Sequence, residues 1–239
     1  MSTYQAVFQR KEVKYLLSDA QLAALMPILK AHMKPDVFPH SSISNLYYDT
    51  DDFRMIRRSL EKPQYKEKLR LRSYGIPGDG SMVFPEIKKK AQGIVYKRRV
   101  SMPYAQAISF LAGKSSAPEG QIYRELRWML ASYPHLSPKV FLSCKRDSWQ
   151  GIEQSALRLT LDREIHYRTE RLDLQHDTSG DDILQPGQTL MEVKIPGAAP
   201  LWLSHALSAL WIFPTSFSKY GEAYQRICKE NEMEIKQYA

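Results

Sequence analysis

The sequence predicts an α+β fold rich in β-strands, and three observations support this fold class. Apolar and charged residues alternate in about eight short segments, as in half-buried strands. Helical periodicity appears in about five further segments. Two turn signals, GIPGDGS at 75–81 and Gln92-Gly93, separate consecutive strand segments as hairpin turns do. The 239-residue chain shows no internal repeat or long linker, so we expect a single domain over residues 1–239.

The elements follow from the alternation, the helical period and the turn signals, in chain order. The predicted strands cover residues 5–15, 43–49, 64–74, 82–90, 94–102, 139–149, 155–168 and 188–195. The predicted helices cover residues 18–33, 104–113, 119–133, 199–210 and 217–236. Ser18 suits an N-cap of the first helix, and Pro27 inside that helix is expected to bend it.

The composition narrows the class of partner. A hydrophobic fraction of 43% is enough for a substantial core, which argues against a disordered polymer. The formal net charge of +8 favours acidic partners such as nucleic acid, phosphate compounds or an anionic membrane surface. Net charge alone does not choose among these three.

The sequence lacks the signals of secretion and of several common active sites. The two cysteines, Cys144 and Cys228, have no metal-ligand spacing and fit a reducing compartment. The six histidines show no HxH or HExxH spacing, and no Walker A, GxSxG or GxGxxG motif is present. The N-terminus has no apolar run typical of a signal peptide, and the apolar stretch at 201–213 is too short to span a bilayer. We therefore expect a cytoplasmic protein without a transmembrane segment.

The strand predicted at 64–74 carries the most informative alternation. Its cations all have the same parity: Lys66, Lys68, Arg70 and Arg72. Leu69 and Leu71 have the opposite parity. Alternate side chains of a strand point to opposite faces, so one face of this strand is cationic and the other apolar.

Other predicted strands repeat this separation of charged and apolar faces. Residues that share a face are Arg10, Glu12 and Lys14; Phe84, Glu86, Lys88 and Lys90; Lys97 and Arg99; Arg158, Thr160 and Asp162; and Glu192 and Lys194. For any single strand, an ordinary half-buried sheet with its charges in water remains the alternative. Together, however, lysine and arginine dominate these faces and repel one another, so we expect a bound anion to neutralise them. If the sheet closes into a barrel, the cationic face lines the bore and the apolar face lies outside under helices.

Nine segments, in this order, resemble the catalytic domain of the vacuolar transporter chaperone (VTC) family. They are RKEVKYLL, NLYYDT, YKEKLRLRSYG, VFPEIKKK, GIVYKRR, KRDSW, LRLTLD, LMEVKIPG and SFSKYGEAY. The family belongs to the triphosphate tunnel metalloenzymes, which are related to the CYTH proteins. The resemblance implies an eight-stranded antiparallel closed barrel with helices packed outside. Basic residues in its interior would hold a triphosphate or polyphosphate, and a carboxylate would hold Mn²⁺ or Mg²⁺.

The same resemblance implies roles for particular residues. The matches to catalytic and substrate-binding positions are Lys14, Arg70, Arg72, Lys88, Lys97, Arg146, Arg158 and Lys219, with Ser218 as a further substrate-binding match. Ser218 also suits the N-cap of the last helix. Glu192 matches the metal-binding glutamate, and Glu12 is a weaker candidate ligand. Arginine suits these positions because guanidinium makes bidentate bonds to phosphate oxygens.

Two positions depart from the family pattern. The wider superfamily has an acidic residue where this sequence has Arg10, which removes one potential metal ligand. Members often carry a tyrosine where this sequence has Cys144, so a contact through that tyrosine's hydroxyl is not expected here.

The expected function is metal-dependent phosphoryl transfer on a triphosphate or polyphosphate chain. In the eukaryotic polymerase members of the family, ATP supplies the phosphoryl group and the product is inorganic polyphosphate, so polyphosphate synthesis is the leading interpretation. A triphosphatase or polyphosphatase on the same scaffold is the first alternative, and a non-catalytic polyphosphate- or RNA-binding module is the second. We expect no DNA partner. RNA is disfavoured because no aromatic residue interleaves the cations of 66–72, where bases would stack. A membrane partner protein is compatible with the sequence but not encoded in it.

Overall fold

The computed structural model describes residues 10–92, 94–115 and 119–237, and side chains within 11–230 of that range. Its contacts divide the chain into two compact units. Unit 1 takes in the described residues up to Ser41, then Lys145–Glu164 and Leu184–Phe217. Unit 2 takes in Ser42–Cys144, Ile165–Ile183 and the described residues from Ser218 onward. The single domain expected from the sequence stays a prediction.

Three of the places where the chain passes from one unit to the other lie inside long strands. These strands are β2 (Met33–Asp49), β7 (Ser137–Gly151) and β8 (Arg158–Arg168). Each strand therefore contributes residues to both units, and the two units are described separately below.

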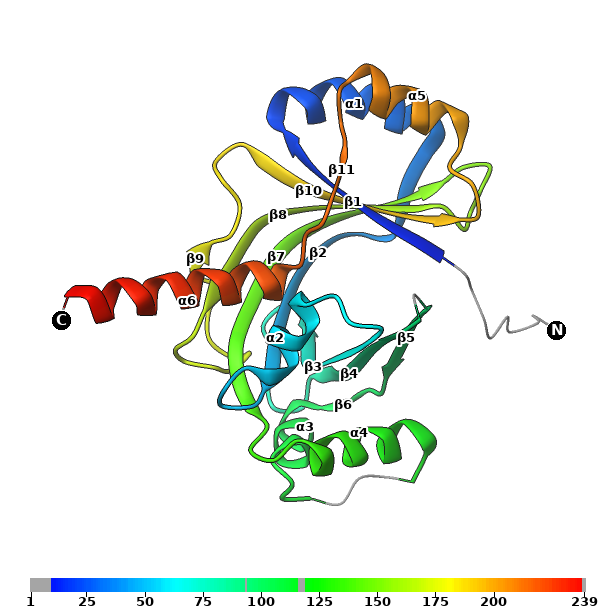
Figure 1. The fold of residues 1–239 in the computed structure, drawn as a ribbon. Helices are drawn as coiled ribbons and strands as arrows, with labels where there is room; N and C mark the ends of the chain where they lie inside the picture. The colour runs from blue at the N-terminus through cyan, green and yellow to red at the C-terminus, as the bar shows by residue number, and fades with distance from the viewer. Residues whose placement is uncertain (1–9, 93, 116–118, 238–239) are drawn as a thin grey trace. The chain divides into compact units, whose positions relative to one another are not determined.

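Unit 1 is built on antiparallel strands with helices against their apolar face. β1 (Arg10–Ser18) pairs with β11 (Pro214–Thr215) and with β10 (Gln188–Pro196), and β10 pairs with β8. Helices α1 (Asp19–His32) and α5 (Leu201–Ala209) lie side by side (Figure 1). Apolar residues of both helices and of β1, β8 and β10 form one buried cluster. Ser18 caps α1 through a capping box with Gln21, as the sequence predicts.

Unit 2 contains a second antiparallel set of strands. β3 (Tyr65–Tyr74) pairs with β2 and with β4 (Met82–Ala91), and β4 also pairs with β5 (Ile94–Arg99) and β6 (Met102–Pro103). The short β9 (Asp181–Asp182) pairs with β8. The helices are α2 (Arg54–Leu60), α3 (Tyr104–Leu111), α4 (Gln121–Ser132) and α6 (Lys219–Gln237). Figure 1 shows α3 and α4 beside the β4–β6 strands, and a buried apolar cluster joins them.

The α+β class and the antiparallel sheet are confirmed, and each predicted strand and helix has a counterpart. Four elements escaped prediction: α2 and the two-residue strands β6, β9 and β11. The described pairings run in the order β11-β1-β10-β8-β7-β2-β3-β4-β5, with β6 and β9 as side branches, so the sheet has eleven strands rather than eight. This path has two ends among the described residues, so it does not confirm the closed barrel.

Several expectations concern residues outside the described part of the chain. They are the first half of the strand predicted at 5–15, the Gly93 position of the second turn and the side chain of Arg10. Within the described residues, none of the helices combines the length and the apolar character needed to cross a membrane.

Candidate functional site

The predicted site residues fall into two groups, one in each unit. Unit 2 contains Arg70, Arg72, Lys88, Lys97, Ser218 and Lys219. Unit 1 contains Glu12, Lys14, Arg146, Arg158 and Glu192.

The register of β3, β4 and β5 places the cations of unit 2 in rows on one face. Lys68 lies opposite Lys88, and Lys88 lies opposite Lys97, so one row holds three lysines from three strands. Residues directly opposite in an antiparallel pair point to the same face. The next row contains Arg70, Glu86 and Arg99 in the same order of strands. We call this surface, which also includes Arg72, the β3–β5 cationic face.

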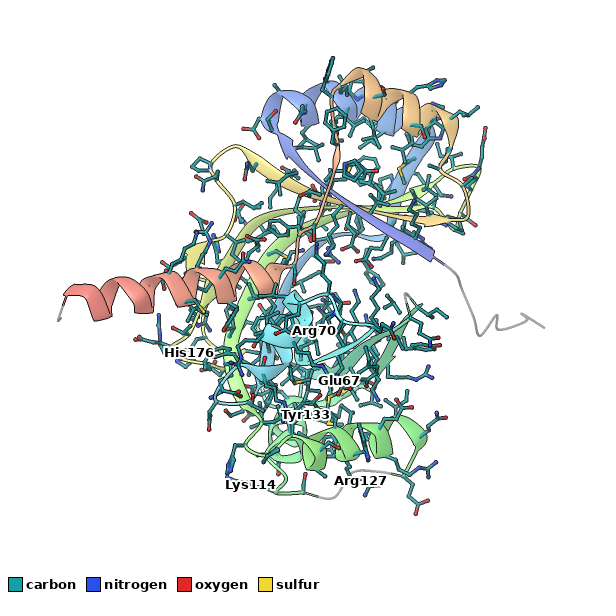
Figure 2. The ribbon with its side chains drawn as sticks, viewed as in Figure 1. Glu67, Arg70, Lys114, Arg127, Tyr133 and His176 are labelled. Atoms are coloured by element: carbon teal, nitrogen blue, oxygen red, sulfur yellow. The ribbon has the colours of Figure 1, made fainter. Side chains whose placement is uncertain are left out.

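The opposite face of β3 is the buried side of the sheet, as the alternation predicts. Leu69 and Leu71 are 0% exposed and belong to the apolar cluster with α3 and α4. Glu67, which has the same parity, accepts a hydrogen bond from the hydroxyl of Tyr133 at 2.6 Å. Figure 2 shows Glu67 and Tyr133 together, with Arg70 farther along β3. The predicted separation of the two faces is therefore confirmed.

Glu86 is the buried centre of the β3–β5 cationic face, with its side chain 2% exposed. Its Oε2 accepts hydrogen bonds from Nη2 and Nε of Arg70 at 2.6 and 2.8 Å. Its Oε1 lies 2.9 Å from Nζ of Lys97. Two further guanidinium groups approach this carboxylate, that of Arg72 to 4.0 Å and that of Arg99 to 3.9 Å. From the sequence we expected a bound anion to neutralise these cations. Glu86 already supplies part of that negative charge.

The charges on this face shift the pKa values of both an acid and a base. Burial by itself would raise the pKa of Glu86, but the charges of Arg70, Arg72 and Lys97 outweigh it and lower this pKa to about 2. The pKa of Lys97 is lowered to about 8, mainly by burial. The attraction of Glu86 opposes this shift, and the repulsion from Arg72 and Arg70 adds to it. Glu86 is thus ionised at neutral pH, and Lys97 titrates just above it.

Strand β2 adds two polar groups to the same face. Asn45 lies opposite Arg72, and its Oδ1 accepts a hydrogen bond from Nε of Arg72 at 2.9 Å. Tyr47 lies opposite Arg70, and its hydroxyl oxygen accepts a hydrogen bond from Nη1 of Arg70 at 3.0 Å. Both arginines are therefore held in place on two sides.

The start of α6 brings Ser218 and Lys219 into unit 2. The hydroxyl of Ser218 accepts a hydrogen bond from the backbone N–H of Gly221 at 3.1 Å, as expected for an N-cap. The same hydroxyl lies 3.0 Å from Nζ of Lys68, which donates to it. Lys219 follows as the first residue of the helix. The N-cap role of Ser218 is confirmed, and it connects α6 to the β3–β5 cationic face.

In unit 1, the paired strands β1 and β10 bring acidic and basic residues together. Lys14 lies opposite Glu192, and its Nζ is 3.9 Å from Glu192 Oε2 and 3.8 Å from Glu12 Oε1. The same ammonium donates to the backbone oxygen of Phe217 at 2.8 Å. Glu192 also forms a salt bridge with Lys194, whose Nζ lies 2.9 Å from Glu192 Oε1. Both predicted metal ligands therefore lie around one lysine.

The two predicted arginines of unit 1 are each held by an aspartate. Arg146 makes a bidentate pair with the fully buried Asp162, from Nε to Oδ1 at 2.5 Å and from Nη2 to Oδ2 at 2.6 Å. Arg158 pairs with Asp36 through Nη1. A carboxylate partner of this kind fixes the orientation of each guanidinium group.

The surroundings of Glu192 allow a test of the expected metal ion. Burial of this carboxylate opposes ionisation, but the charges of Lys194, Lys14 and Arg146 outweigh it and hold its pKa well below the usual range. Directly opposite Glu192, the buried hydroxyl of Thr160 has no hydrogen-bond partner among the described residues. Nowhere in that part of the chain do three acidic, histidine or cysteine side chains gather as a metal cage. These residues fit a divalent cation that one or two carboxylates hold together with water and substrate phosphate.

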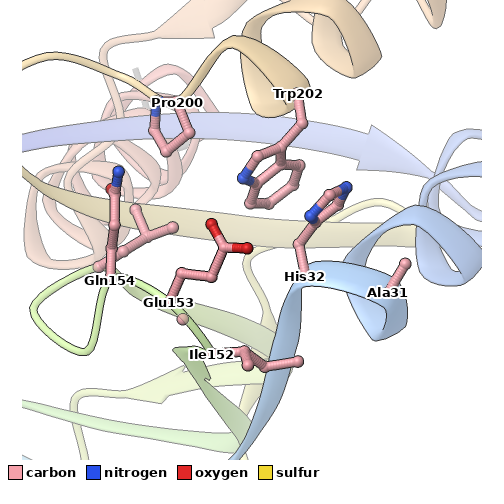
Figure 3. Close-up of a pocket in the computed structure, with 9 residues that line it drawn as sticks. Ala31, His32, Ile152, Glu153, Gln154, Pro200 and Trp202 are labelled. Carbon is pink, nitrogen blue, oxygen red and sulfur yellow. The ribbon is translucent and has the colours of Figure 1, made fainter.

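Unit 1 also contains a small pocket away from these ion pairs. It lies between the end of α1, the turn after β7 and the start of α5, and His32, Glu153 and Trp202 line it (Figure 3). The rings of His32 and Trp202 stack at 4.5 Å. Its volume is about 90 Å³, and neither lysine nor arginine lines it. The pocket therefore has neither the charge nor the size for a triphosphate.

The main residues that sequence reasoning did not select are Glu86, Tyr47 and Asp162. Glu86 and Asp162 have the parity of the cationic faces, but parity does not reveal which cation each carboxylate meets. For Glu86 a signal existed, because the 75–81 turn sets the register that brings it opposite Arg70. Tyr47 gives no comparable signal, because apolar residues flank it in NLYYDT.

Comparisons with known proteins agree with this architecture. A sequence profile of the VTC domain matches residues 9–228. Vacuolar transporter chaperone complex subunit 4 of Trypanosoma cruzi (strain CL Brener) is 23% identical over 90% of this chain and 34% of its own length. The subunit of the same name from Trypanosoma brucei brucei (strain 927/4 GUTat10.1) is 24% identical over 71% of this chain and 27% of its own length. The chain thus spans about a third or less of these relatives.

A solved structure shows the same fold. The Hippeastrum protein HpAC1, named for adenylyl cyclase and described as having a dominant triphosphatase activity, superposes with a TM-score of 0.52. The similarity covers 87% of this chain and 92% of that protein, at 16% sequence identity.

Proposed function

Because this chain belongs to the VTC domain family, we propose that it catalyses metal-dependent phosphoryl transfer on triphosphate and polyphosphate chains. The proposed reaction is the synthesis of inorganic polyphosphate from ATP. The proposal includes closure of the strands into a tunnel, which resemblance to the family implies. It also includes a cytoplasmic location, with any membrane partner supplied by another protein.

The observation that supports the proposal most strongly is the charge balance of the β3–β5 cationic face. Three strands place lysines and arginines in adjacent rows, and Glu86 is the carboxylate that lies among them. Phosphoryl transfer needs positioning and neutralisation of phosphate oxygens more than it needs covalent help from the protein. The arginines suit bidentate contacts with these oxygens, and the lysines act as point charges along a chain.

The proposed roles follow the two groups of residues. Arg70, Arg72, Lys88, Lys97, Ser218 and Lys219 bind phosphate in unit 2, and Lys14, Arg146 and Arg158 do so in unit 1. Glu192, with Glu12 as a second carboxylate, would hold Mn²⁺ or Mg²⁺, which would neutralise charge on the reacting phosphate. Tyr47 and Tyr220, which lie beside Arg70 and Lys68, are buried against each other and offer no open surface for base stacking.

The proposal is tested by incubating the purified protein with ATP and Mn²⁺ and separating the products by size on a gel. A ladder of phosphate chains supports polyphosphate synthesis. Release of free phosphate without chains would instead identify the protein as a triphosphatase. If neither phosphate chains nor free phosphate were formed, an enzymatic function would be refuted.

A matched pair of variants shows whether the activity belongs to the cationic face. Lys97 and Arg98 are neighbours on β5 but point to opposite faces, because Lys97 lies opposite Lys88 and Arg98 lies opposite Ile87. We expect Lys97→Ala to lose most of the activity and Arg98→Ala to retain it. Equal losses in the two variants would count against this placement of the site.

A further inference from the structure

Tyr47 is a buried side chain on the β3–β5 cationic face to which the proposed reaction assigns no role. It lies on β2 directly opposite Arg70, and it is 7% exposed. Its hydroxyl oxygen is used as an acceptor, because Nη1 of Arg70 donates to it at 3.0 Å. A phenol also has one proton to donate, and the acceptor of that proton remains to be identified.

The phenolic proton of Tyr47 meets no acceptor in the described part of the chain. Its closest charged neighbours, Lys68, Arg70 and Arg72, carry only donors. Glu86, the carboxylate in the same row, contacts Arg70 and Lys97, and among the described residues no hydrogen bond joins it to Tyr47. A donor that is more than nine-tenths buried is costly to leave without an acceptor. The missing partner must therefore be an acceptor that does not come from these residues.

We propose that Tyr47 donates a hydrogen bond to a non-bridging phosphate oxygen of a triphosphate or polyphosphate bound beside Arg70. The inference rests on the proposed function, because it assigns a further binding residue to the same substrate class. Phosphate oxygens are acceptors without a proton of their own at this position. They therefore satisfy the phenol and the surrounding cations at the same time.

The ring of Tyr47 is held in a fixed orientation, as a binding residue requires. It stacks on the ring of Tyr220 with the centroids 4.5 Å apart and the planes at 21°. The hydroxyl of Tyr220 donates to Asp49 at 2.9 Å. Asp49 in turn accepts backbone N–H groups from Met55 and Ile56 at the start of α2, at 2.9 and 3.0 Å. This chain of contacts fixes the phenol before a substrate arrives, which lowers the entropy cost of binding.

The electrostatic surroundings make the phenol a stronger donor at neutral pH. Burial opposes its ionisation, but the charges of Arg70, Lys68 and Arg72 outweigh burial and lower the pKa of Tyr47 to about 8. From α6, Tyr220 faces the ring of Tyr47, and its own hydroxyl remains bound to Asp49. The donor is therefore present at pH 7, and about nine-tenths of it is lost in the free protein at pH 9.

The test compares Tyr47→Phe with Tyr48→Phe, which removes the same atom from the next residue of β2. Tyr48 points to the opposite face and belongs to the apolar cluster of unit 2. Affinity for inorganic triphosphate is measured by calorimetry at pH 7 and pH 9, after circular dichroism has shown that each variant is folded. At pH 7 we expect Tyr47→Phe to bind about tenfold more weakly than the wild type, the effect of one charge-assisted hydrogen bond, and Tyr48→Phe to bind as the wild type does. At pH 9 the wild type and Tyr47→Phe should bind almost equally.

Each other result overturns a defined statement. Equal binding of Tyr47→Phe and the wild type at pH 7 would overturn the donor role while leaving the proposed function intact. A loss that persists unchanged at pH 9 would mean that Tyr47 acts only by orienting Arg70, and would overturn the direct contact. An equal loss in Tyr48→Phe would show that the effect does not belong to this face. A wild-type protein that binds no triphosphate would contradict the proposed function itself.

Discussion

Replacing Glu86 by glutamine removes the negative charge at the centre of the β3–β5 cationic face while conserving the shape of the side chain. In the wild type, the carboxylate contacts Arg70 at 2.6 Å and Lys97 at 2.9 Å. In Glu86→Gln these cations keep their positions but lose their partner. We expect the variant to be less stable, because a buried cation without a counter-charge is unfavourable.

The size of the effect follows from the pKa of Glu86, which is lowered from 4.5 to about 2. Each pKa unit corresponds to about 1.4 kcal/mol, so the native state favours the ionised form by about 3 kcal/mol. Solvent screening reduces this value little, because the side chain is 2% exposed. The pKa is depressed in the folded state, so this stability is present above pH 4.5 and is lost as the pH falls from 4.5 towards 2.

The assay is urea denaturation of the wild type and Glu86→Gln between pH 3 and pH 7. At pH 7 the free energy of unfolding of the variant should be about 3 kcal/mol lower, and the difference should shrink below pH 4.5. Inorganic triphosphate should recover more stability in the variant than in the wild type, because the ligand replaces the missing negative charge. A difference at pH 7 below about 0.5 kcal/mol, the range of ordinary surface substitutions, would refute the reasoning.

Glu125→Gln is the matched control for this experiment. Glu125 lies in unit 2 and pairs with Arg98 at 3.6 Å, with both side chains partly exposed. Exposed pairs contribute only about 0–1 kcal/mol, so this substitution should leave the stability nearly unchanged. It should also leave the response to triphosphate as in the wild type.

Three further predictions concern the metal, the pH and the two faces of β3. Glu192→Gln should remove Mn²⁺-dependent turnover and leave the fold intact by circular dichroism, and full activity at saturating Mn²⁺ would contradict the role of this carboxylate. Triphosphate affinity, measured by calorimetry, should fall between pH 7 and pH 9, because Lys97, whose pKa is about 8, loses its charge in that interval and Tyr47 loses its donor proton there too; Lys97→Arg should make this fall smaller, and an undiminished fall in that variant would assign it to Tyr47 and other groups alone. Leu69→Ala should lower the free energy of unfolding by about 2–5 kcal/mol, measured by denaturation, and leave triphosphate affinity unchanged. Arg70→Gln should weaken triphosphate binding, measured by calorimetry. The reverse result would mean that the leucine face, and not the arginine face, binds the phosphate.

The alternation in the sequence was sufficient to predict both faces of β3. Leu69 and Leu71 are buried with α3 and α4, and Arg70 lies on the opposite face with Glu86. Period-two alternation is a local property of a strand, so it is readable without knowledge of the partners. The same holds for the cap of α1, because Ser18 and Gln21 are only three residues apart.

Helix α2 could not be predicted in this way, because it is short and its capping side chains do not stand at the usual N-cap position. The helix is seven residues long, and the residue before it, Phe53, has a left-handed φ of 55° and provides no side-chain cap. Its first N–H groups bind instead to side chains four to seven residues earlier: that of Arg54 to Oγ1 of Thr50, and those of Met55 and Ile56 to Asp49 at the end of β2. Asp49 also accepts a hydrogen bond from Tyr220 of α6, a contact that no local pattern reveals. A helix of two turns is too short to give a clear periodic signal.

The charge balance of the cationic face would let the protein fold before it binds the proposed phosphate chain and still attract that chain. Glu86 contacts Arg70 and Lys97, which removes the strongest repulsion in the folded state. The neutralisation is incomplete, because four cations, Arg70, Arg72, Lys97 and Arg99, lie within 4.0 Å of this one carboxylate. A bound phosphate chain would relieve the positive charge that remains in the unliganded state. A face with a second carboxylate in place of Tyr47 would be more stable alone, but it would repel the phosphate oxygens that we propose the phenol binds.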